Sequence, residues 1–195
     1  MRFICVAICL MCTTLSFSQS GTWYVGVESG INFIETTDDP KSLDFNKKTI
    51  QGGVFGEYFF SESWGVQAKI KLYKVGEVFE DSFFKANQLT IPVVAKKQWG
   101  KRFKFNMVFG GFLAFLSNIE ATDDYGGQFL KDTSEAGLTL GLGFQYGIIG
   151  DKLIAFVDGS AFFGFKNRGY TEGFVSLTNN TINNSQISLG VKFKL

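Results

Sequence analysis

The clearest pattern in the chain is a strict alternation of apolar residues with small or polar ones over residues 136–148. A period of two predicts a β-strand with one apolar face and one polar face. The segment is longer than the roughly five or six residues usual in soluble sheets, and it suits a tilted strand crossing a bilayer, which needs about 9–11 residues. The apolar positions are Ala136, Leu138, Leu140, Leu142, Phe144, Tyr146 and Ile148.

The same alternation predicts eight strands in total. In the fifth strand, where both faces are partly apolar, we place Phe105, Met107, Phe109, Leu113 and Phe115 outward. In the seventh, we place Leu153, Ala155, Val157, Ala161 and Phe163 outward and Asp158 and Ser160 inward. Because proline lacks a backbone donor, we expect a β-bulge at Pro92. The predicted strands are Thr22–Ile34, Thr49–Phe60, Trp64–Val75, Gln88–Gln98, Phe103–Leu116, Ala136–Ile148, Leu153–Gly164 and Ser185–Leu195.

Short and long connections alternate between these strands. The short ones are Ser61–Ser63, Trp99–Arg102 and Ile149–Lys152, and the long polar ones are Glu35–Lys48, Gly76–Asn87, Ser117–Glu135 and Phe165–Asn184. Outer-membrane barrels have short periplasmic turns and longer extracellular loops, so this rhythm favours a transmembrane barrel. Aromatic residues at the short-turn ends indicate an interfacial girdle, against the alternative of ordinary core tryptophans: Trp23, Phe60, Trp64, Trp99 and Phe193.

The N-terminus has the features of a cleaved secretory signal. Arg2 precedes an apolar stretch over residues 3–15 that is too short for a spanning helix, and small residues follow at Ser16 and Ser18. We therefore expect a signal peptide over residues 1–18 and a barrel domain over 19–195, against the alternative of an N-terminal anchor helix. All 3 cysteines lie in the signal segment and the chain has no histidine, which argues against disulfides, zinc sites and His-based catalytic triads.

Charge adds little to this picture. The chain has 19 Lys+Arg and 18 Asp+Glu, so loss of Arg2 leaves the mature protein near neutrality. We expect no nucleic-acid partner, because no basic field is present to attract phosphates.

Two segments resemble a known family. The run Leu89-Thr90-Ile91-Pro92-Val93 and the closing segment from Ile187 to Leu195 are similar to strands of small outer-membrane β-barrel (porin family) proteins of Gram-negative bacteria. The resemblance implies an all-β, eight-stranded antiparallel up-and-down transmembrane β-barrel in the bacterial outer membrane. It also implies contact with lipid and lipopolysaccharide, and recognition of the C-terminal strand by the barrel-insertion machinery. It implies no functional residue, because most such proteins have no assigned activity.

Ionisable residues fall on the predicted inward face. In a lumen this narrow, opposite charges must pair to offset their desolvation, so we expect Glu28 and Glu57 to pair with lysines. One interpretation is a structural salt-bridge plug, and the other is a narrow polar conduit or small-ligand pocket. The predicted lumen network is Glu28, Glu57, Lys69, Lys71, Lys96, Asp158 and Lys192, with Lys194 also predicted to point inward.

The predicted loops carry two further features. The pairs Asp38-Asp39 and Asp123-Asp124 are weak candidates for Ca²⁺ ligands, and solvated loop charges are the simpler interpretation. Exposed aromatics there either anchor an extracellular partner or fold back onto the barrel mouth: Phe83, Phe84, Tyr125, Phe129, Tyr170 and Phe174. We predict no catalytic residue, cofactor or metal site.

Three functions remain open at this point. The first is a non-enzymatic structural or surface-interaction protein that works through its extracellular loops and an unknown ligand. The second is a narrow porin or transporter of small or apolar molecules. The third is a soluble lipocalin-like carrier, because Gly21-Thr22-Trp23-Tyr24 resembles the lipocalin opening and Thr122-Asp123-Asp124-Tyr125 faintly resembles its second motif. Apolar faces almost free of charge and the absence of a C-terminal helical segment favour a membrane barrel over a lipocalin.

Overall fold

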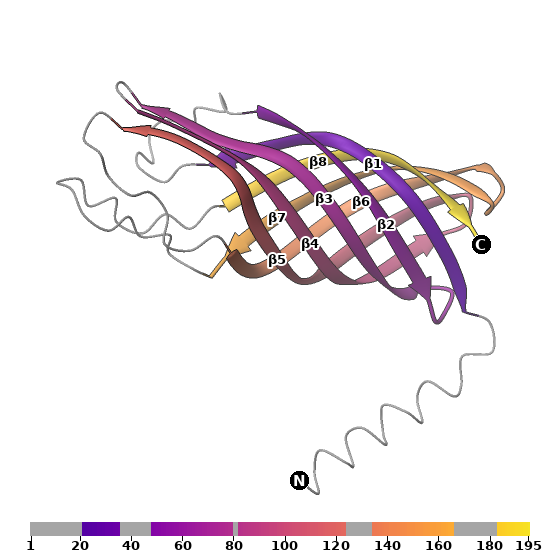
Figure 1. Ribbon diagram of the computed structural model, residues 1–195. Helices are drawn as coiled ribbons and strands as arrows, with labels where there is room; N and C mark the ends of the chain where they lie inside the picture. The colour runs from indigo at the N-terminus through magenta and orange to yellow at the C-terminus, as the bar shows by residue number, and fades with distance from the viewer. Residues whose placement is uncertain (1–20, 36–47, 80–81, 124–133, 166–182) are drawn as a thin grey trace, which may run out of the picture.

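A computed structural model describes residues 21–35, 48–79, 82–123, 134–165 and 183–195. These segments form one closed barrel in which each strand pairs with its neighbours in the sequence and β8 returns to β1 (Figure 1). No helix within them is long and apolar enough to cross a membrane. The strands are β1 Thr22–Glu35, β2 Lys48–Phe59, β3 Trp64–Phe79, β4 Ser82–Gly100, β5 Phe103–Asp123, β6 Ser134–Ile149, β7 Leu153–Gly164 and β8 Asn183–Lys194.

Every pairing between neighbouring strands is antiparallel, including the closing pair of β1 and β8. That closing ladder runs from Tyr24↔Lys194 to Glu35↔Asn183. Closure provides partners for backbone groups that an open sheet would leave exposed at its edges, which is the condition for a sheet to lie in hydrocarbon. The predicted eight-stranded up-and-down barrel is therefore confirmed.

The apolar faces point outward and the polar faces point into the barrel. Along β6, exposed and buried positions alternate almost without interruption, and Leu140 is 55% exposed while Thr139 is 2% exposed. The predicted orientations of the fifth and seventh strands are confirmed: Phe109 and Val157 face outward, whereas Val108 and Asp158 are buried. This arrangement is the reverse of a soluble protein, whose apolar residues fill the core.

The short connections join strand ends at the side where both termini of the barrel domain lie (Figure 1). Gly100, the last residue of β4 before the β4–β5 turn, has a φ of +107°, a backbone conformation that residues with a side chain rarely adopt. In the β2–β3 turn, the Ser61 hydroxyl accepts the Trp64 N–H at 2.9 Å. Around this rim Trp23, Trp64 and Trp99 are 53%, 36% and 41% exposed, as a girdle requires and a core would not.

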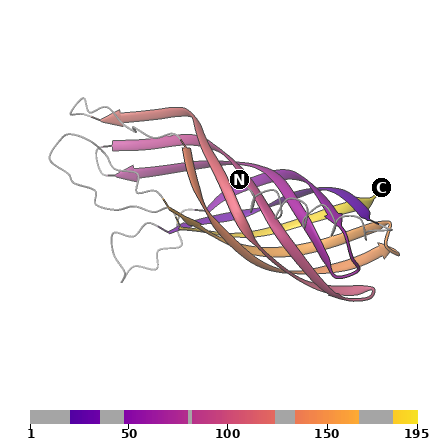
Figure 2. The same ribbon diagram turned by 90° about the horizontal axis from the view of Figure 1, so that it is seen from below.

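The structure corrects the predicted long loop over residues 76–87. Residues 75–79 of β3 pair with residues 82–86 of β4, and β5 continues to Asp123 beside them. The three strands rise beyond the rest of the barrel as one antiparallel extension (Figure 2). Among the described residues, the pairing of β2 with β3 ends at Tyr73, and the pairing of β6 with β5 ends at Phe115. Within these residues, the extension therefore has one strand edge on each side. In the sequence, apolar and polar residues do not alternate strictly over residues 76–87, so the pattern did not indicate a strand there.

The expected bulge at Pro92 is also wrong. The β3–β4 pairing lacks the pairs of Pro92 and Ile91, but the register is the same on either side, and Pro92 stays in register with Phe112 of β5. The missing N–H thus interrupts one ladder without shifting it. The β4–β5 bulge lies instead between Lys85 and Asn87, opposite Asn118, whose φ of +49° fits a bulged position.

Several predicted features lie outside the described residues: the signal segment over residues 1–18, the acidic pair Asp38-Asp39, and Asp124. The aromatics Tyr125, Phe129, Tyr170 and Phe174 lie outside as well. Phe83 and Phe84 belong to β4 rather than to a loop, and Asp123 is the last residue of β5.

Candidate functional site: the polar interior of the barrel

The half of the lumen nearest the short turns, which face the periplasm in barrels of this architecture, is organised around one buried carboxylate. Glu57 on β2 is 1% exposed, and its two oxygens face Lys96 Nζ at 2.6 Å and Lys192 Nζ at 2.5 Å. The Gln67 amide also donates to Glu57. Because Lys96 and Lys192 come from β4 and β8, this cluster ties together strands that are not neighbours. Two ammonium groups share one carboxylate, so the cluster carries one excess positive charge.

A second ionic cluster lies at mid-height and uses the odd-numbered strands. Glu28 on β1 meets Lys69 Nζ at 2.7 Å and Lys71 Nζ at 2.8 Å, both from β3. Lys69 Nζ also lies 3.6 Å from Asp158 on β7, and the Asn106 amide on β5 donates to the same carboxylate at 3.2 Å. Two carboxylates and two lysines balance here. Buried ion pairs of this kind are favourable only when extra hydrogen bonds satisfy the remaining groups, as Asn106 does.

A glycine makes room for this central cluster. The Cα position of Gly143 on β6 lies so close to Asp158 that an added Cβ would collide with Oδ1 of that carboxylate, and would lie 2.7 Å from the Asn106 amide nitrogen. The absence of a side chain at Gly143 is therefore what allows Asp158 to reach into the lumen beside Asn106.

The extracellular half of the lumen is held mainly by neutral hydrogen bonds. The Tyr73 hydroxyl receives the Gln88 amide at 2.9 Å and the Asn184 amide at 3.3 Å, and lies 3.1 Å from the Thr90 hydroxyl. Gln51 donates to the Ser188 hydroxyl at 2.8 Å. Lys71 joins the two halves, because its ammonium group also donates to Gln186 at 2.9 Å.

Apolar side chains pack against the polar column in both halves. Tyr24, Phe59 and Ile154 cluster in the periplasmic half. Phe112, Ala114 and Phe162 cluster in the extracellular half, where Ala114 pairs with Thr90 and Phe162 with Asn184. The lysines also lie over aromatic rings, with Lys192 Nζ 4.7 Å from the Tyr24 ring and Lys69 Nζ 5.3 Å from the Phe55 ring. The interior is thus occupied by interlocked side chains along much of its length.

All seven residues of the predicted lumen network are buried in the interior. Lys194 is the exception among the predicted inward residues, because it lies exposed at the end of β8, where the barrel opens to the periplasm. The charged residues gave no indication of the neutral network around Tyr73, although period-two alternation places those residues on the inner face. It also missed Glu135, which was assigned to a loop but is buried at the start of β6.

An apolar exterior, a polar interior and a closed antiparallel sheet together define a small transmembrane β-barrel of the outer-membrane class. Comparison with known proteins specifies the family. A family model described as outer membrane protein beta-barrel domain matches residues 17–168. The chain belongs to this family, and it is a bacterial outer-membrane protein. The lipocalin-like carrier is thereby excluded. No curated protein matches the chain.

Solved structures share the fold at low sequence identity. The chain is similar to Neisserial surface protein A (TM-score 0.62, 14% identity, covering 91% of this chain and 100% of that one). It is similar to OprG from Pseudomonas aeruginosa (TM-score 0.64, 15% identity, 88% and 95% covered). It is also similar to Ail, the attachment invasion locus protein of Yersinia pestis, in complex with the heparin analogue sucrose octasulfate (TM-score 0.53, 13% identity, 91% and 100% covered).

Proposed function

We propose that this protein is a non-enzymatic outer-membrane barrel that acts through its extracellular side, with a lumen that serves as a structural plug. The observation that carries the proposal is the occupied interior. Glu57 alone joins three strands through two lysines, and the cluster of Tyr24, Phe59 and Ile154 adjoins it, because Tyr24 pairs with Glu57 and Ile154 with Lys192. A conduit for solutes would need these side chains to separate, at the cost of leaving buried charges unpaired.

Single-channel recording tests the plug directly. The full barrel, refolded and inserted into a planar bilayer, is expected to conduct no measurable ion current. The heat-dependent shift of the folded barrel on gels serves as the control for folding. A steady conductance from the wild-type barrel would overturn the plug and support the narrow porin or transporter instead.

The extension formed by β3, β4 and β5 supports an extracellular role. Its backbone pairing continues from Val75↔Ala86 to Phe79↔Ser82 and carries β5 to Asp123. Strand edges of this kind can add a further strand from a partner, and their affinity comes from main-chain hydrogen bonds. Ail, whose name describes an attachment and invasion locus, has the same fold. We propose that the extension of this chain contacts a partner outside the cell.

Shortening the extension separates this role from barrel stability. A variant lacking residues 77–84 joins β3 to β4 lower down and removes only the tip. Cells displaying this variant are expected to lose adhesion to surfaces that the wild-type barrel binds, with an unchanged gel shift. Retained adhesion would contradict a role for the extension.

The last strand supports a proposed contact with the barrel-insertion machinery. β8 ends beside β1, and Phe193 on its outer face is 53% exposed. An exposed aromatic at this position is accessible before the barrel closes. Phe193→Ala is expected to slow insertion in cells severalfold while leaving refolding from denaturant in detergent unchanged. Equal slowing in both assays would attribute the effect to folding alone.

A further inference from the structure

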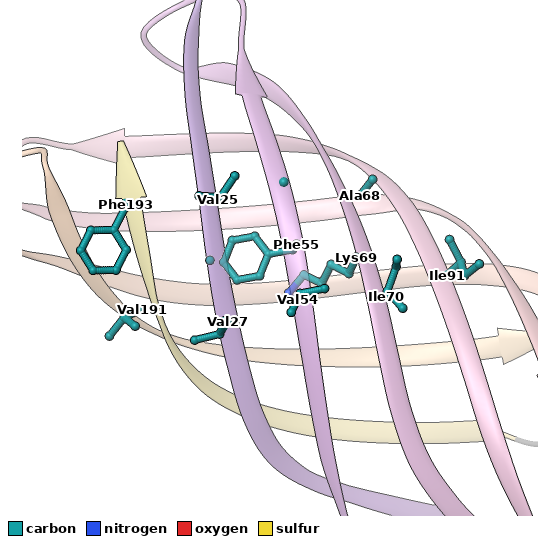
Figure 3. A pocket seen from close by; sticks show the side chains of 12 residues that line it. Val25, Val27, Val54, Phe55, Ala68, Lys69, Ile70, Ile91, Val191 and Phe193 are labelled. Atoms are coloured by element: carbon teal, nitrogen blue, oxygen red, sulfur yellow. The ribbon is translucent and has the colours of Figure 1, made fainter. Parts of the chain in front are cut away.

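The outer wall of the barrel is hollowed on one side. An open groove of about 630 Å³ crosses five adjacent strands, β8, β1, β2, β3 and β4, and its exposed lining is almost entirely apolar (Figure 3). One row of branched side chains forms its upper border, with Val27, Val54 and Ile70 in register on neighbouring strands. In the next outward-facing row towards the periplasm, Gly56 on β2 pairs with Ala68 on β3. Because these residues have little or no side chain, the outer surface is hollowed there.

The groove has a direction that fits one leaflet of the membrane. At one end it is lined by Phe193, next to the last residue of β8 at the periplasmic rim, and at the other by Ile91 in the middle of β4. Strands lie about 4.8 Å apart, so five strands span about 19 Å along the groove. With strands tilted by about 45°, this path rises about 13 Å, which is close to half of the ~25 Å apolar band of such barrels.

Cationic residues lie at the periplasmic end of the groove. Lys152 and Lys194 are both exposed, and the backbone of Lys194 donates to the Lys152 carbonyl at 3.0 Å. Lys194 pairs with Tyr24, so it occupies a lumen-side position of β8 and reaches the outer wall around the end of the strand. Their neighbour Leu153 pairs with Phe193 of the groove lining. A molecule lying in the groove with a negatively charged end at the rim would lie next to these two lysines, and exposed lysines near a membrane surface attract anionic lipid.

We propose that the groove is a binding site for a phospholipid of the periplasmic leaflet, with an acyl chain over Gly56 and Ala68 and an anionic headgroup beside Lys152 and Lys194. The apolar lining suits hydrocarbon, the rise of the groove suits one leaflet, and the charge at its lower end suits a phosphate. A second copy of the barrel fits less well, because a two-fold dimer would place the groove opposite the same groove of its partner and leave both hollows unfilled. Lipopolysaccharide fits less well because its headgroup lies at the opposite rim.

Two glycines allow a matched test. A Cβ at Gly56 or at Gly52 would meet no atom within 4 Å, so both positions accept a side chain without a clash. Both face outward on β2, but only Gly56 lines the groove. Gly56→Leu is therefore expected to fill the groove, whereas Gly52→Leu adds the same side chain to the wall just outside it.

The measurement is the number of lipids retained by the full barrel, counted by native mass spectrometry after extraction from vesicles of phosphatidylglycerol and phosphatidylcholine. Wild type and Gly52→Leu are expected to retain one phosphatidylglycerol. Gly56→Leu is expected to bind it about tenfold more weakly, because leucine displaces about two methylene groups worth ~0.8 kcal/mol each. The gel shift checks that each variant is folded.

The headgroup contact has its own variants. Lys152→Ala with Lys194→Ala is expected to remove the preference for phosphatidylglycerol over phosphatidylcholine, while Lys101→Ala, in the β4–β5 turn across the barrel, is expected to keep it. Equal retention by Gly56→Leu and wild type would overturn the proposal. So would a dimer of wild-type barrels that Gly56→Leu dissociates, or lipopolysaccharide as the retained lipid in a parallel extraction from outer membranes.

Discussion

The two halves of the lumen are both filled by polar side chains, but one half is held by ion pairs and the other by neutral hydrogen bonds. Towards the periplasm and at mid-height, four lysines face three carboxylates across distances of 2.5–3.6 Å. Towards the cell exterior, amides and hydroxyls converge on Tyr73. A buried charge depends strongly on its partner, whereas a neutral group loses much less when one hydrogen bond is removed. We therefore expect stability to be concentrated in the ionic half, with the extracellular half the first to open.

The largest effect is expected from removing the charge of Glu57. Glu57→Gln leaves Lys96 and Lys192 buried without a counter-charge, and breaking a buried pair in this way costs about 3–5 kcal/mol. The free energy of unfolding of the refolded barrel in lipid vesicles, measured by urea titration, provides the check. Glu62→Gln in the exposed β2–β3 turn is the control and is expected to change it by no more than about 0.5 kcal/mol.

A rescue variant shows whether the stability lost in Glu57→Gln comes from unpaired charge or from altered packing. Adding Lys96→Met and Lys192→Met to Glu57→Gln removes the unpaired ammonium groups while keeping unbranched side chains in the lumen. Most of the lost stability is expected to return, because neutral replacement of a complete ionic cluster is often tolerated. A triple variant as unstable as the single one would mean that packing, rather than charge, makes this half the stronger.

A smaller effect is expected from crowding the central cluster. Gly143→Ala places a methyl group against Asp158 and Asn106, and overpacking of this kind costs about 1–3 kcal/mol. Gly52→Ala, on the outer wall with open space around it, is the matched control and is expected to be neutral or slightly stabilising. The same urea titration distinguishes them, and equal stabilities of the two variants would contradict the tight fit around Gly143.

The neutral half is expected to respond less than the ionic half. Tyr73→Phe removes the hydroxyl that receives Gln88 and Asn184, and a lost buried hydrogen bond costs about 1–3 kcal/mol. Hydrogen exchange of backbone amides should show the loss on the extracellular side of β3, β4 and β8, with little change around Glu57. A loss as large as that of Glu57→Gln, or one spread evenly over the barrel, would remove the distinction between the halves.

The alternation of residues was sufficient to predict the barrel and the orientation of its strands. Hydrocarbon outside and a narrow polar lumen inside impose opposite requirements on successive residues, and Leu138 and Thr139 obey them. The alternation was not sufficient for the extension of β3, β4 and β5, because residues 76–87 do not alternate strictly and their polar residues indicated a loop. The bulge predicted at Pro92 is absent from the described pairings, because a missing donor can interrupt a ladder without shifting its register.

The sequence also could not predict which side chains contact one another inside the lumen. Alternation placed Glu57 and Lys192 on the inner face, but their contact depends on how far β2 and β8 are staggered around the barrel, which no single strand encodes. Glu135 was missed for a related reason: it lies at a strand end, where polar composition resembles a loop. The sequence thus predicted which side chains enter the lumen and left open which of them meet.

The smallest effect is expected from a lysine outside the barrel. Lys97 Nζ lies 4.9 Å from the Trp64 ring and 5.1 Å from the Trp99 ring at the periplasmic rim, where it is only partly buried. An exposed cation–π contact is worth about 0.5–1 kcal/mol, so Lys97→Met is expected to cost no more than this. Lys96, one residue earlier, faces the lumen, and Lys96→Met leaves Glu57 with one ammonium partner instead of two. Urea titration of both variants is expected to show the larger loss for Lys96→Met. The reverse order would place the stability of this barrel in its girdle rather than in its ionic interior.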